Sequence, residues 1–258
     1  MGTYGELVES LRKYKKIGVC HSGGACSVLL LKASADAVGK ENVTALTAHT
    51  DFFTDEGIER ARRSARYLDI KHLVIGVRML GEEKIIRNAS DICYHCKKMF
   101  IGELAREAKR EGLDVLLDAS PCSRTGSEST GLKAALEEGL VFPLIELKTG
   151  REEVKSMLTD EGLRRFTYEP DTCLATRFET GVRIDAQKLK EICALEMMTG
   201  RMGFDPVRVR LLKDGIRIEV EESSLSELMD EREEIERELR DLGHDRVEFS
   251  VIHERTCC

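Results

Sequence analysis

The sequence lacks any long hydrophobic run. No stretch approaches the roughly 20 consecutive apolar residues that a membrane-spanning helix requires, and the polar N-terminus lacks the apolar core of a signal peptide. We therefore expect a cytoplasmic protein with no membrane partner. An excess of positive charge is also missing, because 47 acidic and 40 basic side chains give a net charge of −7. Such a chain has no general attraction for nucleic acid, which we do not expect as a partner.

Internal repeats and low-complexity tracts are absent as well. The chain has 258 residues, of which 41% are hydrophobic, so it exceeds the usual domain size of about 100–200 residues. This amount of apolar material is sufficient for a sizeable core and excludes a disordered chain. The sequence therefore predicts a globular protein with one large and one smaller domain.

Strand-like and helix-like segments alternate in the first part of the chain. Strands are expected at 16–20, 43–48, 72–77 and 115–118, and helices at 27–38, 54–68, 96–111 and 132–138. Thr54 is a suitable N-cap for the second of these helices. This alternation predicts an α/β fold with a doubly wound parallel sheet.

The pattern becomes less regular after Pro143 and changes near Gly181. Beyond it, helices are expected at 186–199 and 225–242, and strands at 207–211, 216–220 and 247–252. These segments indicate a smaller α+β domain, and we place the two domains at residues 1–180 and 181–258. The charged run 230–241 is interpreted as a solvated helix face with i,i+4 charge pairs.

A Ser/Gly loop, His21-Ser-Gly-Gly-Ala-Cys-Ser27, follows the first predicted strand. Backbone N–H groups at the start of a helix can bind a phosphate, and glycines let the backbone approach it. The loop matches neither GxxxxGK[ST] nor GxGxxG, so a tight strand-to-helix turn without a ligand is an equal alternative. His21, beside the loop, is a candidate phosphate contact.

Nine cysteines in a chain expected in a reducing compartment indicate metal binding or thiol chemistry rather than disulfides. Cys93-Tyr-His-Cys96 places two thiols three residues apart at a helix start, where thiolate is favoured. Zinc, an iron–sulfur cluster, a redox dithiol and coincidence all fit this pair. Because no second CxxC is present, a single distant cysteine is the informative partner, and Cys173 is the best candidate.

The loop resembles the signature SGGxDS of the PP-loop ATP pyrophosphatase superfamily, which also follows the first strand. The matching residues are Ser22, Gly23, Gly24 and Ser27. This resemblance implies an ATP site with Mg²⁺ in this loop, lined also by the segment 49–51 with Asp51. Cys26 stands where the superfamily has the Asp, which removes a carboxylate beside the pyrophosphate and its magnesium.

Two further motifs, 91–98 around the CxxC and 169–178 around Cys173, resemble signatures of the LarE-type ATP-dependent sulfur transferases within this superfamily. The likeness extends to 131–135, 142–144 and 203–210, and so covers nearly the whole chain. The presence of all three cysteines implies the form of the family in which they hold a 4Fe-4S cluster. Cys93, Cys96 and Cys173 are then the metal ligands and the catalytic residues.

The same resemblance implies that three arginines, Arg177, Arg208 and Arg210, neutralise pyrophosphate or the phosphate of a substrate. It further implies adenylation of a small-molecule acceptor, sulfide or another sulfur donor as the source of sulfur, and a homo-oligomer. The loop Asp118-Ala-Ser-Pro-Cys122 departs from the family on the acceptor side, so the acceptor itself is not identified. Cys122 is a candidate fourth thiol or sulfur relay, or a loop cysteine with no role.

Two alternatives stay open. A non-catalytic iron–sulfur or sulfur-carrier protein with a degenerate loop is favoured by Cys26. A tRNA thiolase shares the loop and the three cysteines, but the net charge of −7 stands against it. Cys20 and Cys26 are interpreted as small buried residues at the strand-helix junction, and Cys257 and Cys258 as a tail, with a sulfur-carrier or metal role as the alternative.

Overall fold

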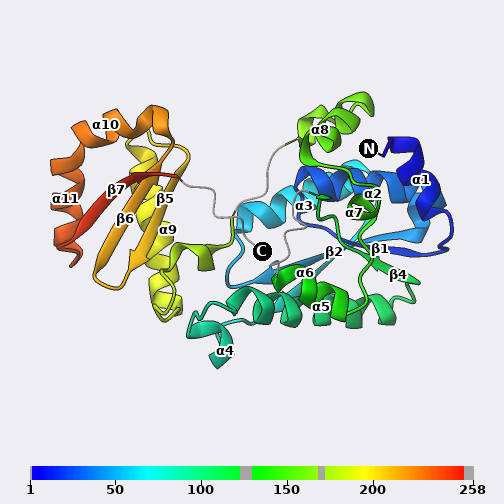
Figure 1. Ribbon diagram of the computed structural model, residues 1–258, viewed down its shortest axis with the longest axis horizontal. Coiled ribbons are helices and arrows are strands. Elements are labelled where there is room, and N and C mark those ends of the chain that lie inside the picture. The colour runs from blue at the N-terminus through cyan, green and yellow to red at the C-terminus, as the bar shows by residue number, and fades with distance from the viewer. Residues whose placement is uncertain (1, 123–129, 168–171, 253–258) are drawn as a thin grey trace. The chain divides into compact units, whose positions relative to one another are not determined.

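The computed structural model describes residues 2–122, 130–167 and 172–252, which divide into two compact units (Figure 1). The first unit contains residues 2–78 and 93–167, and the second contains residues 79–92 and 172–252. The motif residues 169–171 and the terminal Cys257 and Cys258 lie outside the described residues. Within the described parts, no helix combines the length and the apolar character needed to span a membrane.

A four-stranded parallel sheet of order β3-β2-β1-β4 forms the centre of the first unit. The strands are β1 (Ile17–Cys20), β2 (Val43–Thr50), β3 (Lys71–Val77) and β4 (Val115–Leu117). The helices of this unit are α1 (Tyr4–Leu11), α2 (Ala25–Val38), α3 (Asp55–Tyr67), α5 (Ile92–Arg110), α6 (Thr130–Glu137), α7 (Pro143–Glu146) and α8 (Arg151–Asp160), with η1 (Lys40–Asn42) and η3 (Arg164–Phe166) as short 3-10 turns. The predicted strands and sheet type are confirmed.

The strand order explains why helices cover both faces of this sheet. From β1 to β3 the chain moves in one direction across the sheet, and then it returns to place β4 on the other side of β1. Because such crossovers are right-handed, a reversal of direction moves the connecting helix to the opposite face. Figure 1 shows α2 and α3 on one face and α5 on the other, so the doubly wound architecture is confirmed.

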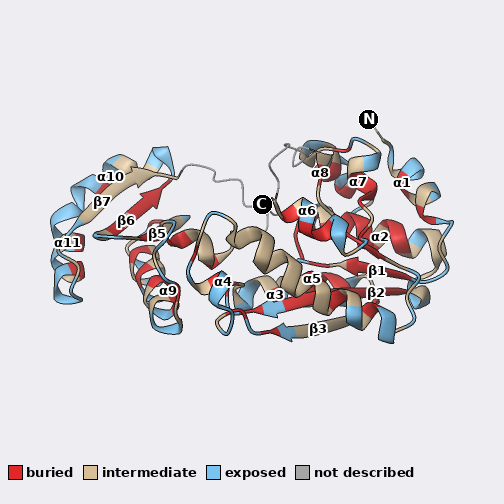
Figure 2. Ribbon diagram, turned by 60° about the horizontal axis from the view of Figure 1, so that its bottom comes forward, coloured by how far each residue is buried: buried red, intermediate tan, exposed pale blue. Residues whose placement is uncertain are grey.

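The core of the first unit lies between the sheet and α2. Leu29, Leu30 and Leu31 are consecutive in α2 and fully buried, because α1 and α8 pack against the side of α2 that faces away from the sheet. Figure 2 shows this helix and the adjacent strands as the most buried part of the unit. A helix that is buried on most of its sides, with Lys32 and Asp36 paired on the remaining one, thus supports the loop that precedes it.

The second unit contains a three-stranded sheet of order β5-β6-β7, with β5 and β6 antiparallel and β6 and β7 parallel. The strands are β5 (Val207–Leu212), β6 (Gly215–Val220) and β7 (Val247–Val251). Its helices are α4 (Glu83–Ile86), α9 (Ala186–Arg201), α10 (Leu225–Asp230) and α11 (Arg232–Asp241), with η4 (Leu174–Arg177) and η5 (Glu222–Ser224) as 3-10 turns. Its core cluster includes Val209, Ile218 and Leu239.

The segment 79–92, between β3 and α5, belongs to the second unit because Asn88 ties it there. The side-chain amide of Asn88 donates to the carbonyl oxygens of Glu179 and Val182, at 2.8 and 3.2 Å, and its own carbonyl accepts from the Gly181 N–H at 2.8 Å. Asn88 is 4% exposed. The segment therefore packs with residues about 90 positions later in the chain.

The structure contains helices that the hydrophobic pattern did not indicate. These are α1, α4, α7 and α8, each of ten residues or fewer. In α8 only Val154 and Leu158 are buried. Two apolar residues are too few to give the helical periodicity by which a helix is predicted from sequence. In addition α5 begins at Ile92, four residues before the predicted start, and the CxxC therefore lies within its first two turns.

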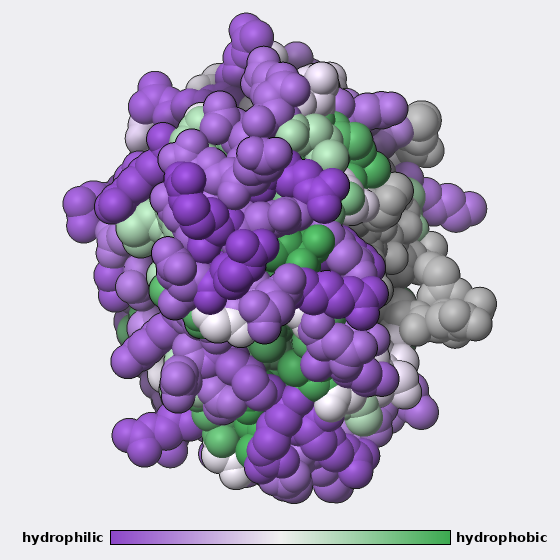
Figure 3. Space-filling view, turned by 90° about the vertical axis from the view of Figure 1, so that its left-hand side faces the viewer, coloured by the Kyte–Doolittle hydropathy of each residue, from purple (hydrophilic) through white to green (hydrophobic). Residues whose placement is uncertain are grey.

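The predicted helix 225–242 is interrupted at Glu231, which ends α10 and precedes α11. Asp230 and Glu234, four residues apart, carry the same charge, and such pairs destabilise a continuous helix. In α11 only Ile235 and Leu239 are buried, and Arg232 pairs with Glu236 at 2.6 Å. The face of the molecule in Figure 3 is mostly hydrophilic. These findings agree with the solvated helix face expected for this run.

Candidate active site

The loop between β1 and α2 has the geometry of an anion site. Gly24 is the N-cap of α2, and among the described residues no side-chain hydrogen bond caps this helix. The first N–H groups of an α-helix have no partner within the helix itself. The Ser22 hydroxyl accepts from the Gly24 N–H at 3.3 Å, and the Ser27 hydroxyl donates to the Gly24 carbonyl at 2.9 Å. Two serines therefore hold the turn closed beneath a helix N-terminus, which suits the phosphates of a nucleotide.

Gly23 is a position of this loop where only glycine fits. Its φ is +76°, in the left-handed region, and a Cβ atom placed there would lie 2.5 Å from the backbone nitrogen of Ala61 in α3. The loop and α3 are therefore in direct backbone contact at this point. The close packing of the loop against α3 therefore explains why the motif has glycine at position 23.

The His21 side chain also contacts α3, next to the point where Gly23 meets it. Its Nε2 lies 2.8 Å from the Ser64 hydroxyl and 3.2 Å from the Ala61 carbonyl, both in α3, and the side chain is 2% exposed. Burial and the neighbouring His72 lower the pKa of His21 to about 3. His21 therefore joins the loop to α3 as a neutral ring, whereas the sequence had offered it as a phosphate contact.

Titration of His21 predicts a loss of stability in mild acid. Between pH 6.5 and about 3 the unfolded histidine binds a proton that the folded ring does not, so the unfolded state gains stability as the pH falls. The contribution is present above pH 6.5 and is lost below it, by up to about 1.4 kcal/mol per pH unit. Urea unfolding at pH 6.5 and 5 should show a weaker pH dependence for His21→Phe than for the natural chain. Equal dependence in both proteins would contradict this assignment.

Asp51 and Cys26 are the other sequence-predicted residues around the loop. Asp51 is exposed and directly follows β2, the parallel neighbour of β1, so it lies at the carboxyl edge of the sheet. Cys26 is half-buried in the first turn of α2 and packs against the apolar core cluster of the first unit. The residue that replaces the superfamily Asp therefore makes apolar contacts here.

The CxxC motif occupies the first two turns of α5 in the same unit. Cys93 and Cys96 are both half-buried. The next residue, Lys97, forms an ion pair with Asp118 at 3.2 Å, and both side chains are largely buried. Because Asp118 directly follows β4, and β4 is a parallel neighbour of β1, this pair anchors the start of α5 at the carboxyl edge of the sheet.

Two further thiols lie on the strands and loops of this edge. Burial and the Asp118 carboxylate raise the pKa of Cys20, so this thiol stays protonated. Cys122 is half-buried, and its backbone N–H donates to the Thr149 carbonyl at 2.9 Å. Cys20 is half-buried, and its interpretation as a small residue at the strand-helix junction stays a prediction.

Cys173 lies in the second unit, directly before η4. Its carbonyl oxygen accepts from the Thr176 N–H at 2.9 Å and from the Thr176 hydroxyl at 2.7 Å. Arg177 is 7% exposed, and its Nε donates to Glu196 in α9 at 2.7 Å. The same Glu196 oxygen accepts the Val209 N–H at 3.0 Å. One carboxylate therefore fixes the turn that follows Cys173 to strand β5.

The structure brings the three predicted arginines into one cluster. Arg210 donates from Nε to Glu219 at 2.7 Å and from Nη1 to the Thr176 carbonyl. Burial, together with repulsion from Arg177 and Arg210, lowers the pKa of Arg208. The other Glu219 oxygen, Oε2, is buried with no hydrogen-bond partner among the described residues. Three guanidinium groups facing two carboxylates leave an excess of positive charge for an anion.

A metal centre is not formed by the described residues as they stand. Among them, no three His, Cys, Asp or Glu side chains are grouped so that they could hold a metal ion. Cys93 and Cys96 belong to the first unit and Cys173 to the second. Cys93 and Cys96 lie one turn apart near the start of α5, and Cys173 directly precedes the anchored turn η4.

Sequence reasoning missed the two glutamates that hold the arginines. Glu219 occupies a sheet position opposite Arg208, on the face away from the core, and strict alternation with Ile218 and Val220 would have placed it there. Glu196 lies in α9, 19 residues from its partner Arg177. The pairing of those two side chains has no local sequence signal.

Comparison with known proteins places the chain in a family. No protein-family model matches it. It is 30% identical over 245 residues to a pyridinium-3,5-bisthiocarboxylic acid mononucleotide synthase of Lactiplantibacillus plantarum, covering 95% of this chain and 89% of that protein. It is 28% identical to an uncharacterized protein of Methanocaldococcus jannaschii, with 91% and 89% covered. It is also 29% identical to one of Synechocystis, with 84% and 78% covered. The chain therefore belongs to the LarE-type family of PP-loop sulfur transferases.

Proposed function

We propose that this protein is an ATP-dependent sulfur transferase that adenylates a small-molecule acceptor and then inserts sulfur into it. The proposal is supported most by one observation, the coexistence in one unit of the Ser/Gly loop 21–27 and a CxxC helix at the carboxyl edge of the same parallel sheet. In open α/β sheets, ligands bind at this edge. The name of the L. plantarum relative supports an acceptor with carboxylic acid groups and a nucleotide moiety.

ATP would bind at the loop 22–27, with its phosphates at the N-terminus of α2 and Mg²⁺ beside them. Asp51, at the carboxyl end of β2, would lie along the nucleotide. We assign pyrophosphate, or the phosphate of the acceptor, to Arg177, Arg208 and Arg210, because clustered guanidinium groups stabilise separating phosphate charge.

The sulfur centre would be held by Cys93, Cys96 and Cys173. A 4Fe-4S cluster held by these three thiolates would supply a position from which sulfur can be transferred. The residues of this chain that support it are Lys97, which anchors the CxxC helix, and Arg177, which anchors the turn after Cys173. Both anchors keep the thiols on ordered backbone, as a metal site requires.

The reaction has two steps. A carboxylate oxygen of the acceptor attacks the α-phosphorus of ATP, the bond to the β-phosphate oxygen breaks, and pyrophosphate leaves. Hydrosulfide then attacks the activated carbonyl carbon with its own electron pair, and AMP leaves with the electron pair of the C–O bond, which gives a thiocarboxylic acid that releases its proton to water. We place the reaction in the cytoplasm, where thiols stay reduced, and in a homo-oligomer.

A second candidate, a non-catalytic cluster or sulfur carrier, is favoured by the packing of Cys26 against the apolar core. Mg-ATP calorimetry on protein purified without oxygen, with iron and acid-labile sulfide measured on the same sample, separates the two. The enzyme should bind Mg-ATP and carry about four irons per chain. Iron without ATP binding would contradict the enzyme and support the carrier.

A matched variant sharpens this test. Cys26→Asp returns a carboxylate to the start of α2, where it can coordinate magnesium. If the enzyme is correct, this variant should bind Mg-ATP more tightly and form AMP faster, by about tenfold, as one added ion contact of about 1.4 kcal/mol would produce. The same affinity in both proteins would show that Cys26 does not limit nucleotide binding.

A further inference from the structure

A buried carboxylate stands on the outer face of the second sheet. Ile218 and Val220 of β6 belong to the core cluster, so Glu219 between them points to the opposite face. Glu219 is nevertheless only 3% exposed. One of its oxygens accepts from the Arg210 Nε at 2.7 Å, and the other, among the described residues, has no partner. Because taking two charges out of water is costly, a buried pair with one unused acceptor is poorly explained by stability alone.

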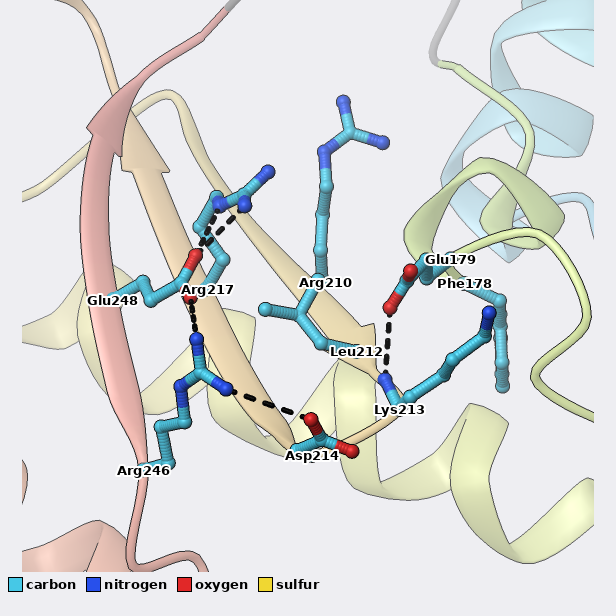
Figure 4. Close-up of a pocket in the computed structure, with 9 residues that line it drawn as sticks. All are labelled: Phe178, Glu179, Arg210, Leu212, Lys213, Asp214, Arg217, Arg246 and Glu248. Carbon is cyan, nitrogen blue, oxygen red and sulfur yellow. Dashed lines mark hydrogen bonds and ion pairs between the residues drawn. The ribbon is translucent and has the colours of Figure 1, made fainter.

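The segment that follows Cys173 pairs with strand β5 of the same unit. β5 is an edge strand of the three-stranded sheet, and Phe178 forms a parallel bridge with Leu211. The Glu179 N–H donates to the Leu211 carbonyl at 2.8 Å. Figure 4 shows Phe178 and Glu179 beside β5, the strand from which the Arg210 side chain extends. This pairing brings the turn η4 into contact with β5.

Four residues form an unbroken series of hydrogen bonds from Glu219 to Cys173. Arg210, held by Glu219, donates from Nη1 to the Thr176 carbonyl. Thr176 donates its N–H at 2.9 Å and its hydroxyl at 2.7 Å to the Cys173 carbonyl. Because a guanidinium group is planar, a carboxylate that fixes its Nε also fixes the direction of its Nη1. The backbone position of Cys173 is therefore linked to a carboxylate on another strand.

A second guanidinium group holds the same turn. Arg177 donates from Nη1 to the Thr172 hydroxyl and, at 3.2 Å, to the Thr176 hydroxyl. The Nε of Arg177 is fixed by Glu196 at 2.7 Å. Thr172 and Thr176 stand on either side of Cys173 in the chain, so the backbone around this thiol is held on both sides.

We propose that Glu219 is a positioning residue for Cys173, which acts by holding Arg210 against the Thr176 carbonyl. This role explains the burial of the carboxylate, because exclusion of water strengthens a hydrogen bond and removes a competitor for the guanidinium group. It also explains why one oxygen is sufficient, since a single contact to Nε sets the orientation of Arg210. The inference rests on the proposed function in one respect, because it is the proposed sulfur centre that requires Cys173 to be held in place.

Hydrogen–deuterium exchange of the whole protein, resolved by peptide, tests the inference. In Glu219→Ala the Arg210 guanidinium loses its anchor, so amides of the segment 173–179 should exchange about tenfold faster, as expected for the loss of one charged hydrogen bond. Glu219→Gln keeps an acceptor oxygen without the charge. Since charge-assisted hydrogen bonds are about twice as strong as neutral ones, this variant should show only about a threefold increase. Amides of α9, in the same unit, should exchange as in the natural chain.

Glu248→Gln is the matched control. Glu248 lies on the same face of the sheet but pairs with Arg217 and Arg246 rather than with the turn after Cys173. Its exchange in the segment 173–179 should equal that of the natural chain. Iron and acid-labile sulfide are measured on the same samples, purified without oxygen. Iron should be lowest in Glu219→Ala and partly restored in Glu219→Gln, since partners that orient metal ligands change metal affinity by about 10–100-fold.

Unchanged exchange of the segment 173–179 in both Glu219 variants would overturn the inference. An equal increase in α9 would also overturn it, because the whole unit would then have been loosened. If Glu219→Ala does not fold, the comparison of Glu219→Gln with Glu248→Gln decides. Faster exchange with full iron content would contradict the role of Cys173 in the sulfur centre and leave the positioning of the turn in place. Reduced iron with unchanged exchange would overturn the inference and leave the proposed sulfur centre in place.

Discussion

Replacing Cys173 by alanine is expected to abolish sulfur transfer and cluster binding together. The variant would remove one of three thiolates, and two thiolates from α5 cannot hold a 4Fe-4S cluster stably. Iron should fall from about four per chain to near zero, and transfer should fall by more than about 100-fold, since even outer-shell changes at metal sites cost about 10–100-fold. Cys93→Ala and Cys96→Ala should have the same effect.

Cys193→Ala is the matched control for these variants. Cys193 is an exposed thiol of α9 in the second unit, so iron, acid-labile sulfide and transfer should all stay at the level of the natural chain. Each sample is purified without oxygen and analysed for iron, sulfide and sulfurated product. If all three ligand variants retained iron and activity, the proposal that these three cysteines hold the sulfur centre would be wrong.

Gly23→Ala is expected to damage both the fold and the nucleotide site. A Cβ atom would meet the Ala61 backbone at 2.5 Å, and alanine disfavours the φ of +76°. Left-handed backbone costs about 1–2 kcal/mol and overpacking about 1–3 kcal/mol, so the free energy of unfolding should fall by about 2–5 kcal/mol. Mg-ATP affinity should fall at least about tenfold, because relief of the clash moves the loop or α3.

Gly102→Ala provides a control with the opposite sign. Gly102 lies within α5, and a Cβ atom there meets nothing within 4 Å. Alanine in a helix interior is about 1 kcal/mol more favourable than glycine, so this variant should be slightly more stable. Urea unfolding of both variants measures the difference. A Gly23→Ala protein as stable as Gly102→Ala would show that the loop tolerates a side chain.

Local patterns predicted most of the first unit, for identifiable reasons. The strands of its sheet are short apolar runs separated by helical segments, and this alternation is itself the signature of a parallel sheet. The Thr54 N-cap was readable because capping acts within three residues, and its hydroxyl accepts from the Gly57 N–H at 3.2 Å. The predictions failed for short helices such as α8, whose apolar face consists of two residues.

The candidate site also has a part that could be predicted from the sequence and a part that could not. The loop and the CxxC are contiguous in sequence, so their chemistry was visible without a structure. The anchors of both are not local. Lys97 reaches Asp118 across 21 positions, Arg177 reaches Glu196 across 19, and Asn88 reaches Glu179 across 91. A contact between residues so far apart depends on the fold, because nothing in either local segment specifies its partner.

The sequence by itself determined the family, the parallel α/β architecture and the positions of the loop, the cysteines and the arginines. It could do so because these features depend on residue type, spacing and periodicity along the chain. Only the tertiary structure decided that Gly23 abuts α3, that segment 79–92 packs in the second unit, and that Glu219 holds Arg210 against the Thr176 carbonyl. Those facts follow from strand register and helix packing, which are set by the burial of apolar faces from distant segments together.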